Sequence, residues 1–138
     1  MIHKLRVQWQ TGEHVSVEVS PRLLGGVWGR KLYRAEPGFS FSIPSDGLAH
    51  SHGSPDYLIP ISGSIRLAYL RPSGVVEELR LEPGYHYTIP PNIPHQVVVS
   101  GGMLESIFPS AVFEHGIPMR KFRPFIRLHQ KGEDMPNE

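Results

Sequence analysis

Short runs of alternating apolar and polar residues, separated by turn residues, extend along most of the chain. In residues 14–20, Val15, Val17 and Val19 fall on one face of an extended strand, and the polar residues between them fall on the other. Repeated short segments of this kind are typical of an all-β domain. The same pattern predicts further strands over residues 27–35, 39–43, 65–69, 75–81, 85–89, 96–99 and 103–108.

The segments between the predicted strands are rich in residues that favour turns. Glu36-Pro37-Gly38 and Arg71-Pro72-Ser73-Gly74 each separate two strands, and the proline-rich residues 90–94 predict a rigid loop. Ser100-Gly101-Gly102 predicts a turn that joins residues 96–99 and 103–108 into a last hairpin. Gly and Pro number 14 each, and breakers at this density leave little room for long helices.

The length of 138 residues fits one domain, and the sequence contains no internal boundary or repeat. From Ser110 onward the character changes, because basic residues alternate with apolar ones up to Leu128. We therefore expect a single barrel domain over residues 1–138, with residues 110–138 as a C-terminal extension. The extension is predicted to pack as a strand or arm on the barrel or on a second subunit. The alternative is a basic flap that binds substrate.

Composition excludes several classes of site and partner. The chain has no cysteine, which rules out disulfides, thiolate metal sites and cysteine nucleophiles. No run of about 18 apolar residues predicts a transmembrane helix, and the first residues lack the apolar stretch of a signal peptide. We therefore expect a cytoplasmic protein. A formal net charge of +1 gives no electrostatic reason to expect nucleic acid or a membrane surface as a partner.

Two histidines stand two residues apart, at His50 and His52. On a strand, the side chains of residues with this spacing project from the same face, and their Cα atoms are roughly 6.5–7 Å apart. Their imidazoles can therefore converge on one metal ion, to which nitrogen ligands bind at about 2.0–2.1 Å. Such a pair alone is a weak signal, so the residues that follow it decide how it is interpreted.

The spacing around this pair resembles the first motif of the cupin family. That motif is H-x-H, three or four residues, Glu, six residues and Gly. Here the chain has His50-Ser51-His52, three residues, Asp56, six residues and Gly63. Asp56 is one methylene shorter than the family's Glu, so its reach to a shared ion is the open question at this position.

A second segment resembles the second cupin motif, which is G, five residues, P-x-G, two residues, H, three residues and N. Here the chain has Gly84, five residues, Pro90-Pro91-Asn92, two residues, His95, three residues and Val99. Asn92 replaces a glycine, and Asn is the residue other than Gly that best tolerates left-handed backbone. Val99 replaces the closing Asn, which we interpret as a lost polar contact. The joint match of both motifs is far more specific than either one.

The resemblance implies a cupin double-stranded β-helix, a jelly-roll barrel of antiparallel strands. Carried over residue by residue, it implies that His50, His52 and His95 ligate one divalent metal, with Asp56 as a fourth ligand. A set of imidazole and carboxylate ligands without sulfur suits Fe, Mn, Ni, Co or Zn, and the amino-acid sequence does not choose among these metals. The alternative is a metal-free barrel whose histidines line a polar pocket.

Further residues on the predicted strands are candidates to line the pocket, although each of these types is more often found in a core or on a surface. They are Tyr57, Arg66, Tyr85, Tyr87 and Glu105. His86 lies between two tyrosines and is predicted to be packed or to face outward, not to be a ligand.

The predicted function is that of a small metalloenzyme acting on an oxygen-bearing organic substrate. If the ion is iron, the predicted reaction classes include that of a dioxygenase. If the ion is zinc, manganese or nickel, an isomerase, decarboxylase or lyase is favoured. Asp56 would be a general base if it does not bind the ion. A non-catalytic barrel that binds a small ligand is the alternative. A homodimer is expected, because residues 4–9 and 110–128 are candidates to cover sheet edges across a two-fold axis.

Overall fold

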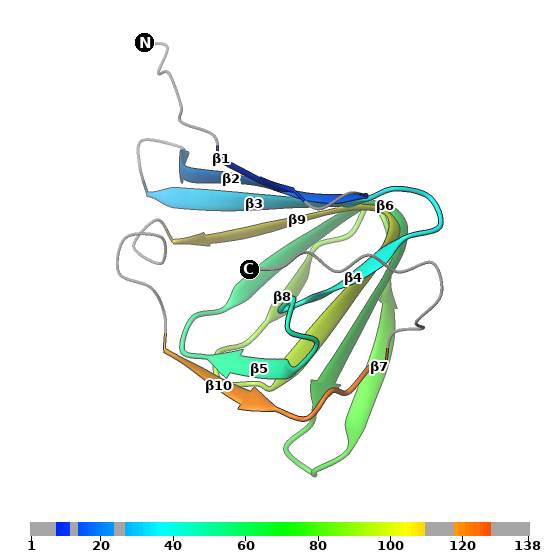
Figure 1. Cartoon of the computed structure of the whole chain (residues 1–138). Coiled ribbons are helices and arrows are strands. Elements are labelled where there is room, and N and C mark those ends of the chain that lie inside the picture. Colours follow the sequence, from blue (N-terminus) through cyan, green and yellow to red (C-terminus); the bar gives the residue numbers. More distant parts are fainter. Residues whose placement is uncertain (1–7, 12–13, 24–26, 110–117, 128–138) are drawn as a thin grey trace.

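The computed structural model describes residues 8–11, 14–23, 27–109 and 118–127, and within these every regular element is a β-strand (Figure 1). This confirms the predicted all-β class. The strands are β1 (Gln8–Thr11), β2 (Val15–Leu23), β3 (Trp28–Ala35), β4 (Ser40–Ile43), β5 (Ala49–His52), β6 (Asp56–Leu70), β7 (Val76–Leu81), β8 (Tyr87–Ile89), β9 (His95–Pro109) and β10 (Met119–Phe122). No helix in these ranges is long and apolar enough to span a membrane.

Several predictions concern segments outside the described residues. Of the N-terminal strand expected over residues 4–9, the structure describes only residues 8 and 9, which begin β1. Residues 110–117 and 128–138 of the expected C-terminal extension also lie outside the described residues. The statements below concern the described part of the chain.

Two long strands, β6 and β9, form the frame of the sheet. Each has 15 residues, and they pair antiparallel from Tyr57↔Ile107 to Tyr69↔His95. The hairpin predicted at Ser100-Gly101-Gly102 is therefore wrong: residues 96–99 and 103–108 belong to one strand that bends. Glycine pairs predict turns from local sequence alone, whereas here the glycines lie where two paired strands bend together.

Close backbone contact explains why glycines occupy this bend. The register of β6 and β9 shifts between Pro60 and Ser64, and Gly63 and Gly101 have positive φ angles of 79° and 54°. A Cβ atom on Gly63 would lie 2.5 Å from the carbonyl oxygen of Gly101, closer than van der Waals contact permits. The glycines thus let both strands bend at the same level, which closes the sheet into a barrel.

The bent β9 pairs on both sides along its length. Its first half pairs with β4 and β6, and its second half pairs with β3 and β6, while β2 and β1 continue the sheet beyond β3. In Figure 1, β1, β2 and β3 lie side by side at one side of the molecule and β5 with β10 at another. The core between these layers contains Val15, Val17, Phe41, Leu104 and their neighbours.

The C-terminal segment packs on the barrel of its own chain. β10 pairs with β5 through four residues, and Ile126 is buried against Ala68 and Val98. The fully buried Gln96 side chain accepts hydrogen bonds from the backbone amides of Phe125 and Ile126 and donates to the carbonyl of Ile126. The described part of the extension therefore packs on the barrel of its own chain, which is one of the arrangements that the sequence predicted.

Candidate metal centre

The two predicted motifs meet across neighbouring strands. His50 in β5 pairs directly with His95 at the start of β9, and their ring centroids are 4.5 Å apart. His52 follows on the same face of β5, with its ring centroid 5.1 Å from that of His50 and 5.2 Å from that of His95. Three imidazoles, up to 45 positions apart in the sequence, thus face one point.

Asp56, the first residue of β6, completes the cluster. Its Oδ2 lies 3.1 Å from Nε2 of His52 and 2.9 Å from Nε2 of His95. One ligand atom from each of the four residues can be chosen so that all lie within 4.8 Å of one another. The shorter carboxylate therefore reaches the histidines directly, because the chain bends at Gly53-Ser54-Pro55 and Asp56 returns to His52, four residues earlier.

The hydrogen bonds of two imidazoles fix which nitrogen faces the cluster. Nδ1 of His52 lies 2.7 Å from the carbonyl oxygen of Ser54, and Nδ1 of His95 lies 2.7 Å from that of Ile93. A carbonyl oxygen only accepts, so each Nδ1 carries a proton and donates it. In a neutral imidazole protonated at Nδ1, Nε2 carries a lone pair, which here points at the lone pairs of the Asp56 carboxylate. This contact is favourable only if an imidazole is doubly protonated or a cation lies between the groups.

The electrostatics of the cluster agree with that account. Burial raises the pKa of the Asp56 carboxyl, but the hydrogen bonds with His52 and His95 together lower it by a larger amount. The pKa of Asp56 therefore lies below its usual value. The hydrogen bond to Asp56 raises the pKa of His52, despite burial. Burial, together with the neighbouring His95 and His52, lowers the pKa of His50 to about 3, which keeps that imidazole neutral and able to ligate.

The distances in the cluster fit one transition-metal ion. Two ligand atoms bound at about 2.1 Å along perpendicular axes are about 3.0 Å apart. The contacts of Asp56 Oδ2 with the two Nε2 atoms, at 2.9 and 3.1 Å, match this separation. In addition, the buried Nδ1 of His50 has no hydrogen-bond partner within the described residues. Three imidazoles, two of them with tautomers fixed by carbonyls, plus one carboxylate form a donor set that suits such an ion.

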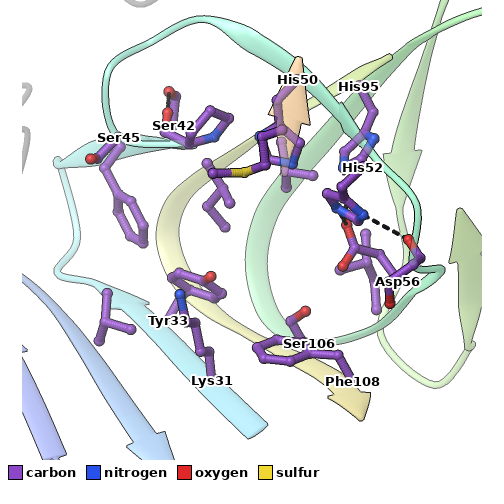
Figure 2. A pocket seen from close by; sticks show the side chains of 18 residues that line it. Lys31, Tyr33, Ser42, Ser45, His50, His52, Asp56, His95, Ser106 and Phe108 are labelled. Carbon is purple, nitrogen blue, oxygen red and sulfur yellow. Dashed lines mark hydrogen bonds and ion pairs between the residues drawn. The ribbon is translucent and has the colours of Figure 1, made fainter. Parts of the chain in front are cut away.

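The cluster opens into a cavity of about 350 Å³ inside the barrel, a size typical of sites for small molecules. Figure 2 shows the three histidines and Asp56 on one side of this pocket and Lys31, Ser106 and Phe108 on another. Much of the remaining wall is apolar and is formed by Val17, Phe41, Ile43, Leu58, Val97 and Met119.

Comparisons with known proteins support the fold. The chain is similar to oxalate decarboxylase from Bacillus subtilis at pH 4.6, with a TM-score of 0.65 and 13% identity over 88% of this chain and 33% of that one. A structure that describes substrate binding in an oxalate decarboxylase gives a TM-score of 0.60 and 13% identity over 79% of this chain and 30% of that one. These are cupin structures. The chain has the cupin fold.

The likeness is one of architecture. No family model matches the sequence, and no curated protein is similar to it. The chain spans about a third of the length of the solved structures that it matches. The assignment to the cupin fold therefore rests on the three-dimensional arrangement.

Two departures from the cupin motifs are explained by the cupin fold of this chain. Asn92, which replaces a glycine, adopts the predicted left-handed conformation with φ 64°. Its backbone N–H donates a hydrogen bond to the backbone carbonyl of His52 at 2.7 Å. The loop before β9 is thus tied to the strand that carries two histidines. Val99 is completely buried in the core, which explains why a polar side chain is dispensable there.

The other predicted pocket residues do not line this cupin pocket. Tyr57, Arg66, Tyr85, Tyr87 and Glu105 are all absent from its walls. His86 lies just before β8 and is exposed, so its predicted placement away from the ligands agrees with the structure, although it is not within a strand.

Sequence reasoning missed Lys31, Tyr33 and Ser106, which do line the pocket. The alternation in residues 27–35 places Lys31 and Tyr33 on one face. It does not predict that this face lies near the histidine cluster, because the pairing of β3 with β9 joins residues 69 to 81 positions apart.

Proposed function

We propose that this protein is a metal-dependent cupin, a metalloenzyme whose ion is held by His50, His52, His95 and Asp56. The observation that carries the proposal is the pair of Nε2 atoms facing one oxygen of Asp56, with both Nδ1 protons already donated to carbonyls. A divalent cation removes the repulsion among these lone pairs.

The substrate is proposed to be a small organic molecule with a chelating oxygen group, such as a hydroxy acid, a keto acid, an enol or a sugar. The ion supplies Lewis acidity toward that group, with iron adding dioxygen chemistry. The chain itself supplies a cavity with mostly apolar walls and a carboxylate, Asp56, at the cluster. The reaction classes that fit are dioxygenase, isomerase, decarboxylase and lyase.

The first experiment measures the metal. Protein purified without added metal should contain about one equivalent of a first-row transition metal by elemental analysis, and His50→Ala and His95→Ala should lose it. His86→Ala is the matched control, because His86 is exposed and lies outside the cluster. Equal metal content in all four proteins would remove the proposed site.

A non-catalytic binding module remains the second candidate, and one observation favours it. Among the residues that the structure places around the pocket, Asp56 is the single carboxylate, and it is engaged by two imidazoles. A pocket without a second carboxylate is suited to holding a ligand. A screen of oxygen-bearing acids with the metal-loaded protein separates the two: turnover supports the enzyme, and saturable binding without turnover supports the module.

A further inference from the structure

A lysine lies on the wall of the pocket, away from the metal cluster. Lys31 is half-buried on β3, its ammonium lies 6.0 Å from the centroid of the Phe108 ring, and both residues line the cavity. Its neighbour Arg30 faces the other way and pairs with Glu18 and Glu105. Within the described residues, no carboxylate forms an ion pair with Lys31.

The register of three strands places Lys31 relative to the cluster. Lys31 is opposite Ser106 in β9, and Ser106 is opposite Leu58 in β6. All three line the pocket, and Asp56 lies two residues before Leu58 on the same strand and face. Since neighbouring strands are about 4.8 Å apart and residues rise about 3.3 Å, the Cα atoms of Lys31 and Asp56 are separated by roughly 12 Å. Both side chains extend into the cavity, so one small molecule can contact both.

The charges of the pocket give the substrate class. The charged groups among the lining residues are Lys31 and Asp56, and the histidines are neutral when they ligate. With a divalent ion bound, the carboxylate cancels one of the ion's charges and Lys31 adds another. The pocket then carries two net positive charges in mostly apolar surroundings, where an uncompensated charge is costly. A dianion restores neutrality.

We propose that Lys31 selects for short dicarboxylates, in which a 2-hydroxy or 2-oxo acid group chelates the ion and a second carboxylate pairs with the Lys31 ammonium. This inference rests on the proposed function and narrows its substrate class. Apolar contact along the chain of the ligand comes from Leu58, Val97 and Phe108. A monocarboxylate with the same number of carbons places a methyl group beside the ammonium instead.

The test compares matched acids by calorimetry on the metal-loaded protein. Malate is paired with 2-hydroxybutanoate, and 2-hydroxyglutarate with 2-hydroxypentanoate. At least one dicarboxylate should bind about tenfold more tightly than its partner, as expected for a charge-assisted hydrogen bond. Lys31→Met, which keeps an apolar stem, should abolish this preference and leave metal content unchanged. Arg34→Met is the control, since Arg34 is on the same strand but exposed.

A preference that persists in Lys31→Met, or is absent from the wild-type protein, overturns the proposal. A second readout distinguishes it from failure of the metal site. In metal-free protein, the ¹³Cε resonance of Lys31, assigned by its loss in Lys31→Met, should shift with a dicarboxylate and not with its monocarboxylate partner. If the protein takes up no metal, the proposed function fails. The resonance then decides alone: a shift supports the Lys31 site, and no shift overturns it.

Discussion

His50 and His95 are register partners in an antiparallel pair, although 45 positions separate them in the sequence. Their rings meet edge to face with centroids 4.5 Å apart. Because this is the one register pair that joins β5 to β9, the contact between the two motifs occurs at the cluster itself. Changes in the cluster are therefore expected to affect the junction of the two strands as well as metal binding.

The carboxylate of Asp56 is predicted to strengthen metal binding without being indispensable. Asp56→Asn keeps the shape but removes the charge, and we expect metal affinity to fall about 10–100-fold. His52→Ala should nearly abolish binding, and Asp56→Glu, which lengthens the carboxylate by one methylene, should retain it. Competition with a chelator of known affinity measures all three. Identical affinities for Asp56→Asn and the wild type would make Asp56 a residue of the loop and not of the site.

Acidification is predicted to release the metal through His52. Because the pKa of His52 is raised by the hydrogen bond to Asp56, a proton binds His52 in the metal-free protein at a higher pH than an ordinary histidine, near 6.5, would allow. His50 does not compete in this range, since its pKa is lowered to about 3. Metal affinity should thus fall about tenfold per pH unit below the His52 pKa. Full metal retention at pH 4 would contradict this.

The same reasoning predicts a shift in the Asp56→Asn variant. Without the carboxylate, the largest cause of the raised His52 pKa is gone. The pH below which metal affinity begins to fall should therefore move downward, even though affinity at neutral pH is weaker. Affinities measured by chelator competition at each pH from 4 to 8 separate the two effects, because a merely weaker site would show the same pH dependence of affinity as the wild type at lower absolute values.

The bend shared by β6 and β9 is predicted to be intolerant of side chains. Gly63→Ala puts a Cβ atom against the backbone of Gly101 at a positive φ, so we expect it to lower the free energy of unfolding by about 1–3 kcal/mol or more. Gly38→Ala is the matched control, because Gly38 also has positive φ but open space around its Cα. Urea titrations should show the larger loss for Gly63→Ala. Equal losses would mean that backbone strain alone matters.

Gln96 is predicted to hold the C-terminal segment on the barrel. Gln96→Ala leaves the buried amide of Ile126 and that of Phe125 without their acceptor, at about 1–3 kcal/mol for each unsatisfied group. Protease cleavage within residues 118–127 should become faster. Arg127→Ala, an exposed change in the same segment, controls for the loss of a side chain. Cleavage at the wild-type rate would show that the apolar packing of Ile126 suffices.

A homodimer remains a prediction. β10 covers β5 within the same chain, so this edge needs no second subunit. Several exposed apolar residues instead lie in β7 or close to it in sequence, at Val75, Val76, Leu79 and Tyr85, and β7 pairs only with β6 among the described strands. Light scattering at micromolar concentration should give twice the chain mass, and Val76→Lys should reduce it. A monomeric wild type would refute the expectation.

The sequence predicted which side chains lie together better than it predicted how the strands connect. Motif spacing is local, so His50, His52 and His95 could be proposed together, and Asn92 could be predicted to adopt left-handed backbone. The bend at Gly101 was mistaken for a turn, because two adjacent glycines look alike in a hairpin and in a strand that bends against a partner. The role of Lys31 depends on the register of three strands, which alternation along one strand does not specify.

The pairing of β10 with β5 also bears on the order in which the molecule assembles. β5 has one register partner in β9 and four in β10, so its backbone is fully ordered only when a segment about 70 positions later in the sequence has docked. Contacts at such separation form late in folding, because closing a long loop costs entropy before the contacts compensate. During folding, the strand that carries His50 and His52 is therefore among the last to be secured, and metal capture should follow the docking of β10.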